Sequence, residues 1–251
     1  MYKNLCESPL NVTATYGTSN PDYNIDKLHD NNLQTWFSSD RIITPTGDVV
    51  TVTFDFGSAV YADTFITVHN INTTGTMYFK AGDTNPPTTE THGLPLINST
   101  GTSMKYMSSP IYYRFFKLFA NGTKLSEVTK IKEMFIGKRN TLLINPEYPF
   151  SRGSDSVTIV NESEKGQKST YHRYNRHKWA FNYTAVDSSI NDALNNVRNY
   201  CKGSYKPFWF CEDYSDNIVD TFFCRFQGNS FKHSEVMDGV HDVQFAIEEE
   251  L

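Results

Sequence analysis

The sequence predicts an all-β protein that carries one α-helix. Aromatic residues are abundant, with 18 Phe and 15 Tyr among 251 residues, and such side chains favour strands. Short stretches of alternating apolar and polar residues recur along the chain, and clusters of Gly, Pro, Asn and Thr separate them. Strands at this spacing, with turn signals between them, are typical of a sandwich or a barrel.

The first part of the chain contains most of the predicted strands. Residues 49–57 alternate so that four apolar side chains share one face, namely Val50, Val52, Phe54 and Phe56. The other strands predicted here are residues 61–71, 76–83, 110–121 and 129–138. The polar segment 84–103 is rich in Pro, Gly and Thr, so we expect it to be a loop.

A change of pattern near residues 138–150 predicts a domain boundary, with one domain at 1–138 and another at 139–251. Beyond it, residues 156–160 form a predicted strand, and a polar turn follows that suggests a hairpin near 161–170. Residues 177–186 alternate strictly, with Trp179, Phe181 and Tyr183 on one side. Further strands are expected at residues 205–213, 219–228 and 240–251.

One helix is predicted over residues 188–201. Asp187 and Ser188 can cap its start, and Lys202-Gly203 can end it. Its apolar residues fall at helical spacing: Ile190, Leu194, Val197 and Cys201.

Residues 24–37, NIDKLHDNNLQTWF, combine an Asp-Asn-Asn turn with a following Trp36. Asp30 and Asn31 favour a turn because short polar side chains bond to the nearby backbone and tolerate left-handed geometry. We expect Trp36 to pack on the β-core beneath this turn. A second signal is YYRFFKLF at 112–119, followed by EVTKIKEMFIGK at 127–138.

Together these segments resemble the two ends of a discoidin-type, galactose-binding-like β-sandwich. The resemblance implies a jelly-roll sandwich at residues 1–138 and a role in binding rather than in catalysis. It also implies a calcium site, because Asp30, Thr35 and Glu133 match positions that coordinate calcium in some such modules, and Ca²⁺ takes oxygen ligands. Asn32 stands where glycine is more usual. The alternative is that Asp30 only caps the turn and that Glu133 faces solvent.

Sugar binding is the commonest activity that this resemblance implies. It requires exposed aromatic rings that stack on a sugar and polar groups in the adjoining loops. The candidates for glycan contact are Tyr16, Tyr23 and His69. No loop shows an obvious pairing of an aromatic residue with an arginine, so a purely structural or docking module stays open as the alternative.

Four short segments of the second part resemble the tail-tube-derived hub proteins of long-tailed phages, which include distal tail and minor tail proteins. The segments are residues 179–183 (WAFNY), 206–210 (KPFWF), 224–226 (CRF) and 244–249 (QFAIEE). The resemblance implies a tail-tube-like β-sandwich with one flanking α-helix that assembles into a ring of six, a homohexamer. The hairpins near 161–170 and 214–219 are the expected arms to a neighbour.

Other classes of function receive little support. The net charge of −5 argues against nucleic-acid binding, and we interpret the basic run at 171–178 as a solvated strand. No segment approaches the ~20 apolar residues of a membrane helix, and the N-terminus lacks a secretory pattern. The four cysteines form no C-x-x-C pair. No nucleophile elbow, zincin or nucleotide-binding motif is present, so we expect no enzyme.

The two resemblances together imply a structural component of a tailed-phage virion, made in the host cytoplasm and located in the tail. It would be a distal tail or tail-hub ring protein that contacts other tail proteins. Its outward galactose-binding-like module would contact host-surface glycans or dock tail fibres. The alternatives are a free carbohydrate-binding protein from a bacterium and a receptor-binding tail-tip protein.

Overall fold

The computed structural model describes residues 5–7, 9–14, 20–42, 50–69, 76–94, 102–121, 128–142, 151–162, 167–212, 221–228 and 230–250. They fall into two compact units, each with its own sheet and core. Unit 1 contains residues 3–139 with 211–221, and unit 2 contains 140–210 with 222–251. In the described part of the chain, no helix is long and apolar enough to span a membrane.

Unit 1 is built on antiparallel strands in the order β2-β7-β3-β6-β4-β5, and β1 also pairs with β3. The strands are β1 (Asn11–Ala14), β2 (Phe37–Ile42), β3 (Val50–His69), β4 (Thr76–Gly82), β5 (Glu90–Gly93), β6 (Thr102–Asn121) and β7 (Val128–Gly137). Three short 3-10 helices precede or join them: η1 (Leu5–Glu7), η2 (Pro21–Tyr23) and η3 (Ile25–Leu28).

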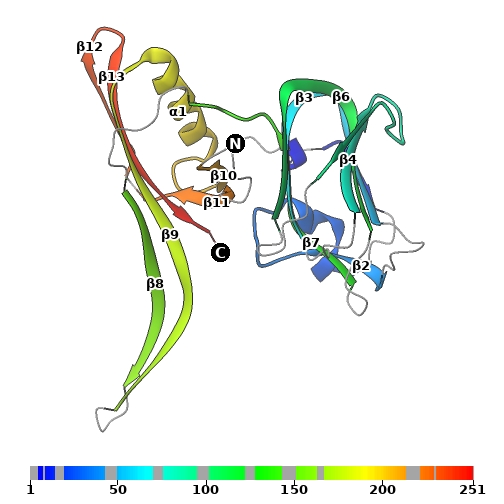
Figure 1. The fold of residues 1–251 in the computed structure, drawn as a ribbon, viewed down its shortest axis with the longest axis horizontal. Helices are drawn as coiled ribbons and strands as arrows, with labels where there is room; N and C mark the ends of the chain where they lie inside the picture. Colours follow the sequence, from blue (N-terminus) through cyan, green and yellow to red (C-terminus); the bar gives the residue numbers. More distant parts are fainter. Residues whose placement is uncertain are drawn as a thin grey trace. The chain divides into compact units, whose positions relative to one another are not determined.

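β3 and β6 are the longest strands of unit 1, and they bend together over one end of it (Figure 1). The bend coincides with register shifts after Asp55 and after Ala62. Gly57 lies in the first shift with φ 76°, a left-handed value that glycine adopts at no steric cost. The two strands predicted at 49–57 and 61–71 are therefore one bulged strand.

The core of unit 1 is aromatic and fully enclosed. Its largest buried side chains include Phe37, Phe54, Phe65, Phe79 and Phe116. The predicted inward face of residues 49–57 is confirmed, because Val50, Val52 and Phe54 are buried and Phe56 packs half-buried against the same core. The prediction that 84–103 is only a loop is wrong, since it contains β5, which pairs with β4. The sequence of β5, ETHG, lacks apolar alternation because this strand lies at the edge of the sheet.

Unit 2 contains a second antiparallel sheet in the order β10-β11-β13-β9-β8, with β12 paired to β13. Its elements are β8 (Ser151–Glu162), β9 (Lys168–Asp187), α1 (Ser188–Tyr200), β10 (Phe208–Cys211), β11 (Thr221–Phe226), β12 (Lys232–Met237) and β13 (Val240–Glu249). The all-β class with one helix is thereby confirmed. β12 has no counterpart among the predicted strands, because every one of its side chains is exposed and no apolar alternation marks it.

The helix α1 begins at the predicted cap. The Asp187 carboxylate accepts hydrogen bonds from the backbone N–H groups of Ser189 (2.9 Å) and Ile190 (3.1 Å). Hydrogen bonds from Ser189 and Ile190 also lower the pKa of Asp187. Gly203, at φ 70°, closes the C-terminus and donates its N–H to the Arg198 carbonyl (3.1 Å).

Aromatic residues also fill the core of unit 2. Trp179, Phe181 and Tyr183 are all buried, as the strict alternation of 177–186 predicts. The Trp179 ring packs against Phe210 and Phe222, with centroids 5.4 Å and 4.9 Å away. Burial raises the pKa of Tyr183 to about 12, so its hydroxyl stays protonated at neutral pH.

One part of unit 2 lies beyond this core. β8 pairs only with β9, from Ser151↔Ala180 to Glu162↔Lys168, and its described side chains are all exposed. Figure 1 shows the two strands reaching away from the rest of unit 2. We call β8 and residues 168–176 of β9 the β8–β9 ribbon. Its tip lies outside the described residues, as does the second expected arm near 214–219.

Candidate functional site

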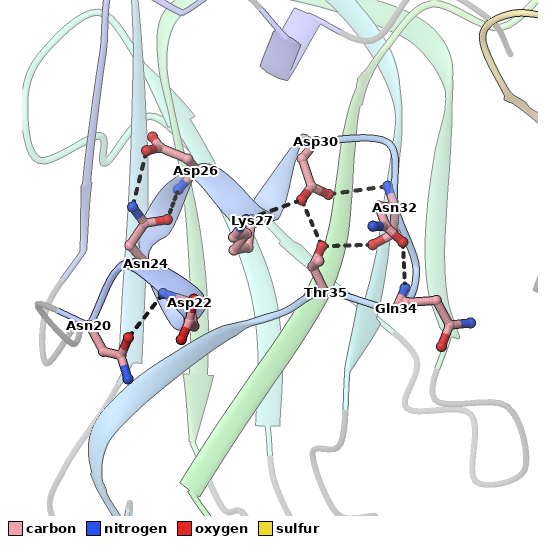
Figure 2. A network of polar contacts seen from close by, with 9 residues as sticks. All are labelled: Asn20, Asp22, Asn24, Asp26, Lys27, Asp30, Asn32, Gln34 and Thr35. Carbon is pink, nitrogen blue, oxygen red and sulfur yellow. Dashed lines mark hydrogen bonds and ion pairs between the residues drawn. The ribbon is translucent and has the colours of Figure 1, made fainter.

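Residues 20–35 of unit 1 form a polar segment in which short side chains hold the backbone (Figure 2). The side-chain oxygens of Asn20, Asn24 and Asn32 each accept the N–H group two residues further on, at 3.0, 3.2 and 2.9 Å. Side chains of this type stabilise turns by such local bonds. Asn31 adopts φ 59°, as the left-handed geometry predicted for this turn requires.

Oxygen atoms converge at the end of this segment. The Thr35 hydroxyl lies 2.7 Å from Asp30 Oδ2 and 3.0 Å from the Asn32 carbonyl oxygen. Asp30 Oδ1 accepts the N–H of Asn32 (3.1 Å), and Lys27 Nζ is 3.9 Å from Asp30 Oδ2. Two of the predicted calcium ligands, Asp30 and Thr35, are thus brought into contact.

The third predicted ligand, Glu133, lies on the neighbouring strand. Phe37 of β2 pairs with Ile131 of β7. Thr35 precedes Phe37 by two residues and Glu133 follows Ile131 by two, so both lie at the same end of this antiparallel pair. Glu133 is fully buried, so the alternative in which it faces solvent is wrong.

A carboxylate, a hydroxyl and a carbonyl oxygen that meet in a turn are the donors that Ca²⁺ prefers. The oxygens of Asp30, Thr35 and Asn32 meet this requirement, and Asp30, Thr35 and Glu133 are the residues that would hold the ion. Among the described residues, no three His, Cys, Asp or Glu side chains form a metal cluster. The fit therefore depends on neutral oxygens, and calcium binding stays a prediction.

Aromatic rings adjoin the same segment. Tyr23 stacks on Trp36 with centroids 5.4 Å apart, and Lys130 Nζ lies 5.2 Å from the centre of the Trp36 ring. Trp36 is half-buried rather than part of the closed core. Tyr23 is 36% exposed, so it can still meet a ligand.

The other predicted glycan contacts are less accessible or lie outside the described residues. His69 is only 6% exposed, and its Nε2 lies 2.8 Å from Ser103 Oγ. Burial lowers the pKa of His69 to about 4, so the ring is neutral at pH 7. Tyr16 lies outside the described residues, so its contact stays a prediction.

A different aromatic surface lies where β3 and β6 bend. Tyr61 and Tyr112 face each other across the two strands and stack with centroids 4.3 Å apart at 29°. They are 61% and 52% exposed. The pairing of β1 with β3 reaches only as far as Asp55, and the pairing of β7 with β3 starts at Thr64. The pairing of β4 with β6 ends at Phe115. In the part of the chain that the structure describes, β3 and β6 therefore pair only with each other here.

A charged pair lies on the same two strands, β3 and β6. Arg114 lies two residues beyond Tyr112 on β6, which places both on one face of the strand. Its Nε and Nη2 atoms donate to the two carboxylate oxygens of Asp55 at 2.7 and 2.8 Å. Hydrogen bonding from Arg114 lowers the pKa of Asp55, so both groups are charged at neutral pH. We call Tyr61, Tyr112, Arg114 and Asp55 the tyrosine ribbon.

The sequence did not reveal the tyrosine ribbon, because Tyr61 and Asp55 of β3 meet Tyr112 and Arg114 only through the pairing of β3 with β6. The sequence analysis found no pairing of an aromatic residue with an arginine in the loops. In the structure, Arg114 lies over an aromatic ring on strand β6, with its Cζ 4.7 Å from the centre of the Phe115 ring.

No family model and no curated protein matches the chain. Among solved structures, the chain is similar to the CpGH89CBM32-6 module produced by Clostridium perfringens (20% identity, TM-score 0.39, 55% of this chain and 100% of that one). It is also similar to chitosan-binding module 1 of a chitosanase/glucanase from Paenibacillus sp. IK-5 (10%, 0.43, 54% and 98%). A third is CpGH89CBM32-5 from C. perfringens in complex with GalNAc-β-1,3-galactose (10%, 0.39, 51% and 94%).

These similar structures are small binding modules, and each covers about half of this chain. They give no support to the tail-hub resemblance of the second part. At such identities and TM-scores the similarity does not support any function. The function must therefore be inferred from the residues of the chain itself.

Proposed function

We propose that unit 1 is a carbohydrate-binding module and that the tyrosine ribbon is its binding surface. The observation that carries this proposal is an exposed, stacked tyrosine pair on the two strands that also carry a bidentate Arg–Asp pair. Aromatic rings offer a flat apolar face with a polar edge, which suits the C–H face of a sugar ring. The charged pair offers directed donors and acceptors, which suit sugar hydroxyls.

The competing interpretation is that Tyr61 and Tyr112 only stabilise the sheet. A cross-strand aromatic pair contributes about 0.2–1 kcal/mol, and single exposed aromatic residues are common. Two features favour a ligand. Both rings are more than half exposed. They also lie on paired strands that hold them in a fixed geometry, and no third described strand pairs with this stretch.

The test is a glycan array probed with the full chain, followed by titration of the best ligand. GalNAc-β-1,3-galactose and chitosan oligosaccharides are suitable first probes, since one similar structure is a chitosan-binding module and another is a complex with GalNAc-β-1,3-galactose. We expect Tyr61→Ala and Tyr112→Ala to weaken binding by about tenfold or more. Tyr205→Ala, at a 71% exposed tyrosine of unit 2, is the matched control.

Tyr23→Ala separates this surface from the segment 20–36. If Tyr23→Ala abolishes binding while Tyr112→Ala does not, the ligand lies on the Tyr23 side and the tyrosine ribbon is not the site. If no glycan binds the wild-type chain, the proposed function itself is wrong.

We propose a second function for unit 2, that of joining the chain to a larger assembly. The observation behind it is the β8–β9 ribbon. β8 offers an edge that pairs with nothing in the described part of the chain, and such an edge is a template for pairing with another chain. A hairpin with two exposed faces is only marginally stable by itself, so a neighbouring subunit would stabilise it.

A closed ring is one assembly that such edges can form, and a tail-hub ring of six in a phage virion is the form that the sequence resemblance implies. Mass photometry and electron microscopy of the full chain test this. Rings that are lost when residues 154–175 are replaced by a short turn would support the assembly role. A chain that stays monomeric at all concentrations would instead favour the free carbohydrate-binding protein.

A further inference from the structure

Two histidines meet on the β12–β13 hairpin of unit 2. His233 Nε2 lies 3.1 Å from His241 Nδ1, and the ring centroids are 5.1 Å apart. β12 and β13 are antiparallel and are joined at Asp238–Gly239, so the two residues come from adjacent strands. His241 is nearly buried at 9% exposure, whereas His233 is exposed on the outer strand.

The distance between the two nitrogens suits a shared metal ion. Imidazole nitrogens bind Zn²⁺ at about 2.0–2.1 Å, so two of them are about 3.3 Å apart in a tetrahedral site and about 2.9 Å apart at a right angle. The observed 3.1 Å lies between these values. One ring must donate and the other accept in the present contact. A modest rotation of the exposed His233 ring would turn both nitrogen lone pairs toward one ion.

A carboxylate is available on the same face of the hairpin. Glu235 follows His233 by two residues, which places it on the same side of β12. It is also directly paired with His241 in the register. Side chains in such cross-strand pairs have Cβ atoms about 4.5–5.5 Å apart. No cluster of three such ligands is already formed among the described residues, so water or Glu235 would complete the coordination.

We propose that His233 and His241 form a binding site for a divalent late transition-metal ion, of the Ni²⁺, Cu²⁺ and Zn²⁺ class. Neutral imidazoles prefer these ions, and with only two histidines the affinity should follow the order in which Cu²⁺ binds most tightly. The bound ion would link the exposed strand β12 to β13. Since a ligand that binds only the folded state stabilises it, the ion would also strengthen this hairpin.

The test uses the full, untagged chain, stripped of metal with a chelator and titrated with each metal chloride alone by calorimetry. We expect one ion per chain, with Cu²⁺ the tightest. His233→Gln changes only an exposed side chain of the outer strand and should weaken binding by about tenfold or more. The matched control is His172→Gln on β9, an exposed histidine whose Nε2 contacts Asn175 (2.9 Å). It should bind as the wild type does.

His241→Gln should lose binding in the same way, but its partial burial makes His233→Gln the decisive variant. A wild-type chain that binds none of the three ions would overturn the proposal. Equal affinity of the wild type and His233→Gln would also overturn it, because the ion would then lie elsewhere.

Discussion

Two strands of equal length show how the two units differ. β3 in unit 1 and β9 in unit 2 each contain 20 residues. β3 pairs with β6 along nearly its whole length and with β1 or β7 on its other edge. β9 has a partner on both edges only near residues 178–180, and its first ten residues pair with β8 alone.

The difference shows that packing by neighbouring strands, rather than residue type, decides which side chains of a strand are buried. Tyr171 and Tyr183 lie on the same strand, yet Tyr171 is 66% exposed and Tyr183 is 3% exposed. Tyr183 faces β13 and the core, with the Phe245 ring 6.1 Å away. Unit 1 closes its core around β3, whereas in unit 2 the described side chains of β8 are all exposed.

The strongest test of this comparison is to truncate one aromatic residue in the part of β9 that pairs with β13 and one in the part that pairs with β8 alone. Trp179→Ala should destabilise unit 2 by about 3–5 kcal/mol, the usual cost of removing a fully buried aromatic side chain. Tyr171→Ala should cost within about 0.5 kcal/mol, as exposed positions do. Urea denaturation followed by circular dichroism measures both. Equal effects would mean that the β8–β9 ribbon is part of the cooperative core.

A second prediction concerns the pH dependence of unit 1. The pKa of His69 falls from 6.5 to about 4 on folding, so the unfolded chain binds the proton more readily between these values. Stability is therefore complete above about pH 6.5 and falls as the pH drops to about 4, by about 3 kcal/mol for this shift. Amide exchange of β3 at pH 7 and pH 4.5 measures the loss, and His69→Gln should reduce it.

A third prediction concerns the predicted calcium ligands. At a calcium concentration 100-fold above its Kd, binding stabilises the folded state by about 2.7 kcal/mol. We expect Ca²⁺ to raise the Tm of the wild type but not that of Asp30→Asn, which loses one ligand charge beside Thr35. Asp22→Asn is the matched control in the same segment. If Ca²⁺ leaves the Tm of the wild type unchanged, the predicted calcium site is wrong.

Much of the fold follows from local signals in the sequence. The helix after Asp187 and the inward row of Trp179, Phe181 and Tyr183 follow directly from capping chemistry and from alternation. The tyrosine ribbon does not, because the contact of Tyr61 with Tyr112 depends on a register that two bulges shift. β12 was not predicted either, because its exposed residues give no apolar pattern.

The last prediction concerns the stability of the tyrosine ribbon, where we expect only a small effect. Tyr61→Ala removes an exposed cross-strand pair and should cost about 0.2–1 kcal/mol, while it strongly weakens glycan binding. Urea denaturation measures the stability of this variant, and Thr51→Ala on the same strand serves as its control. A large loss of stability would mean that the pair is a structural element.

The proposal that the tyrosine ribbon binds a glycan is tested most directly by amide hydrogen exchange. The exchange is measured on the full chain with and without the best glycan from the array. Binding at the tyrosine ribbon predicts that protection increases at residues 57–62 and 106–114 and stays unchanged at 20–36 and throughout unit 2. Protection confined to residues 20–36, or to unit 2, would contradict it.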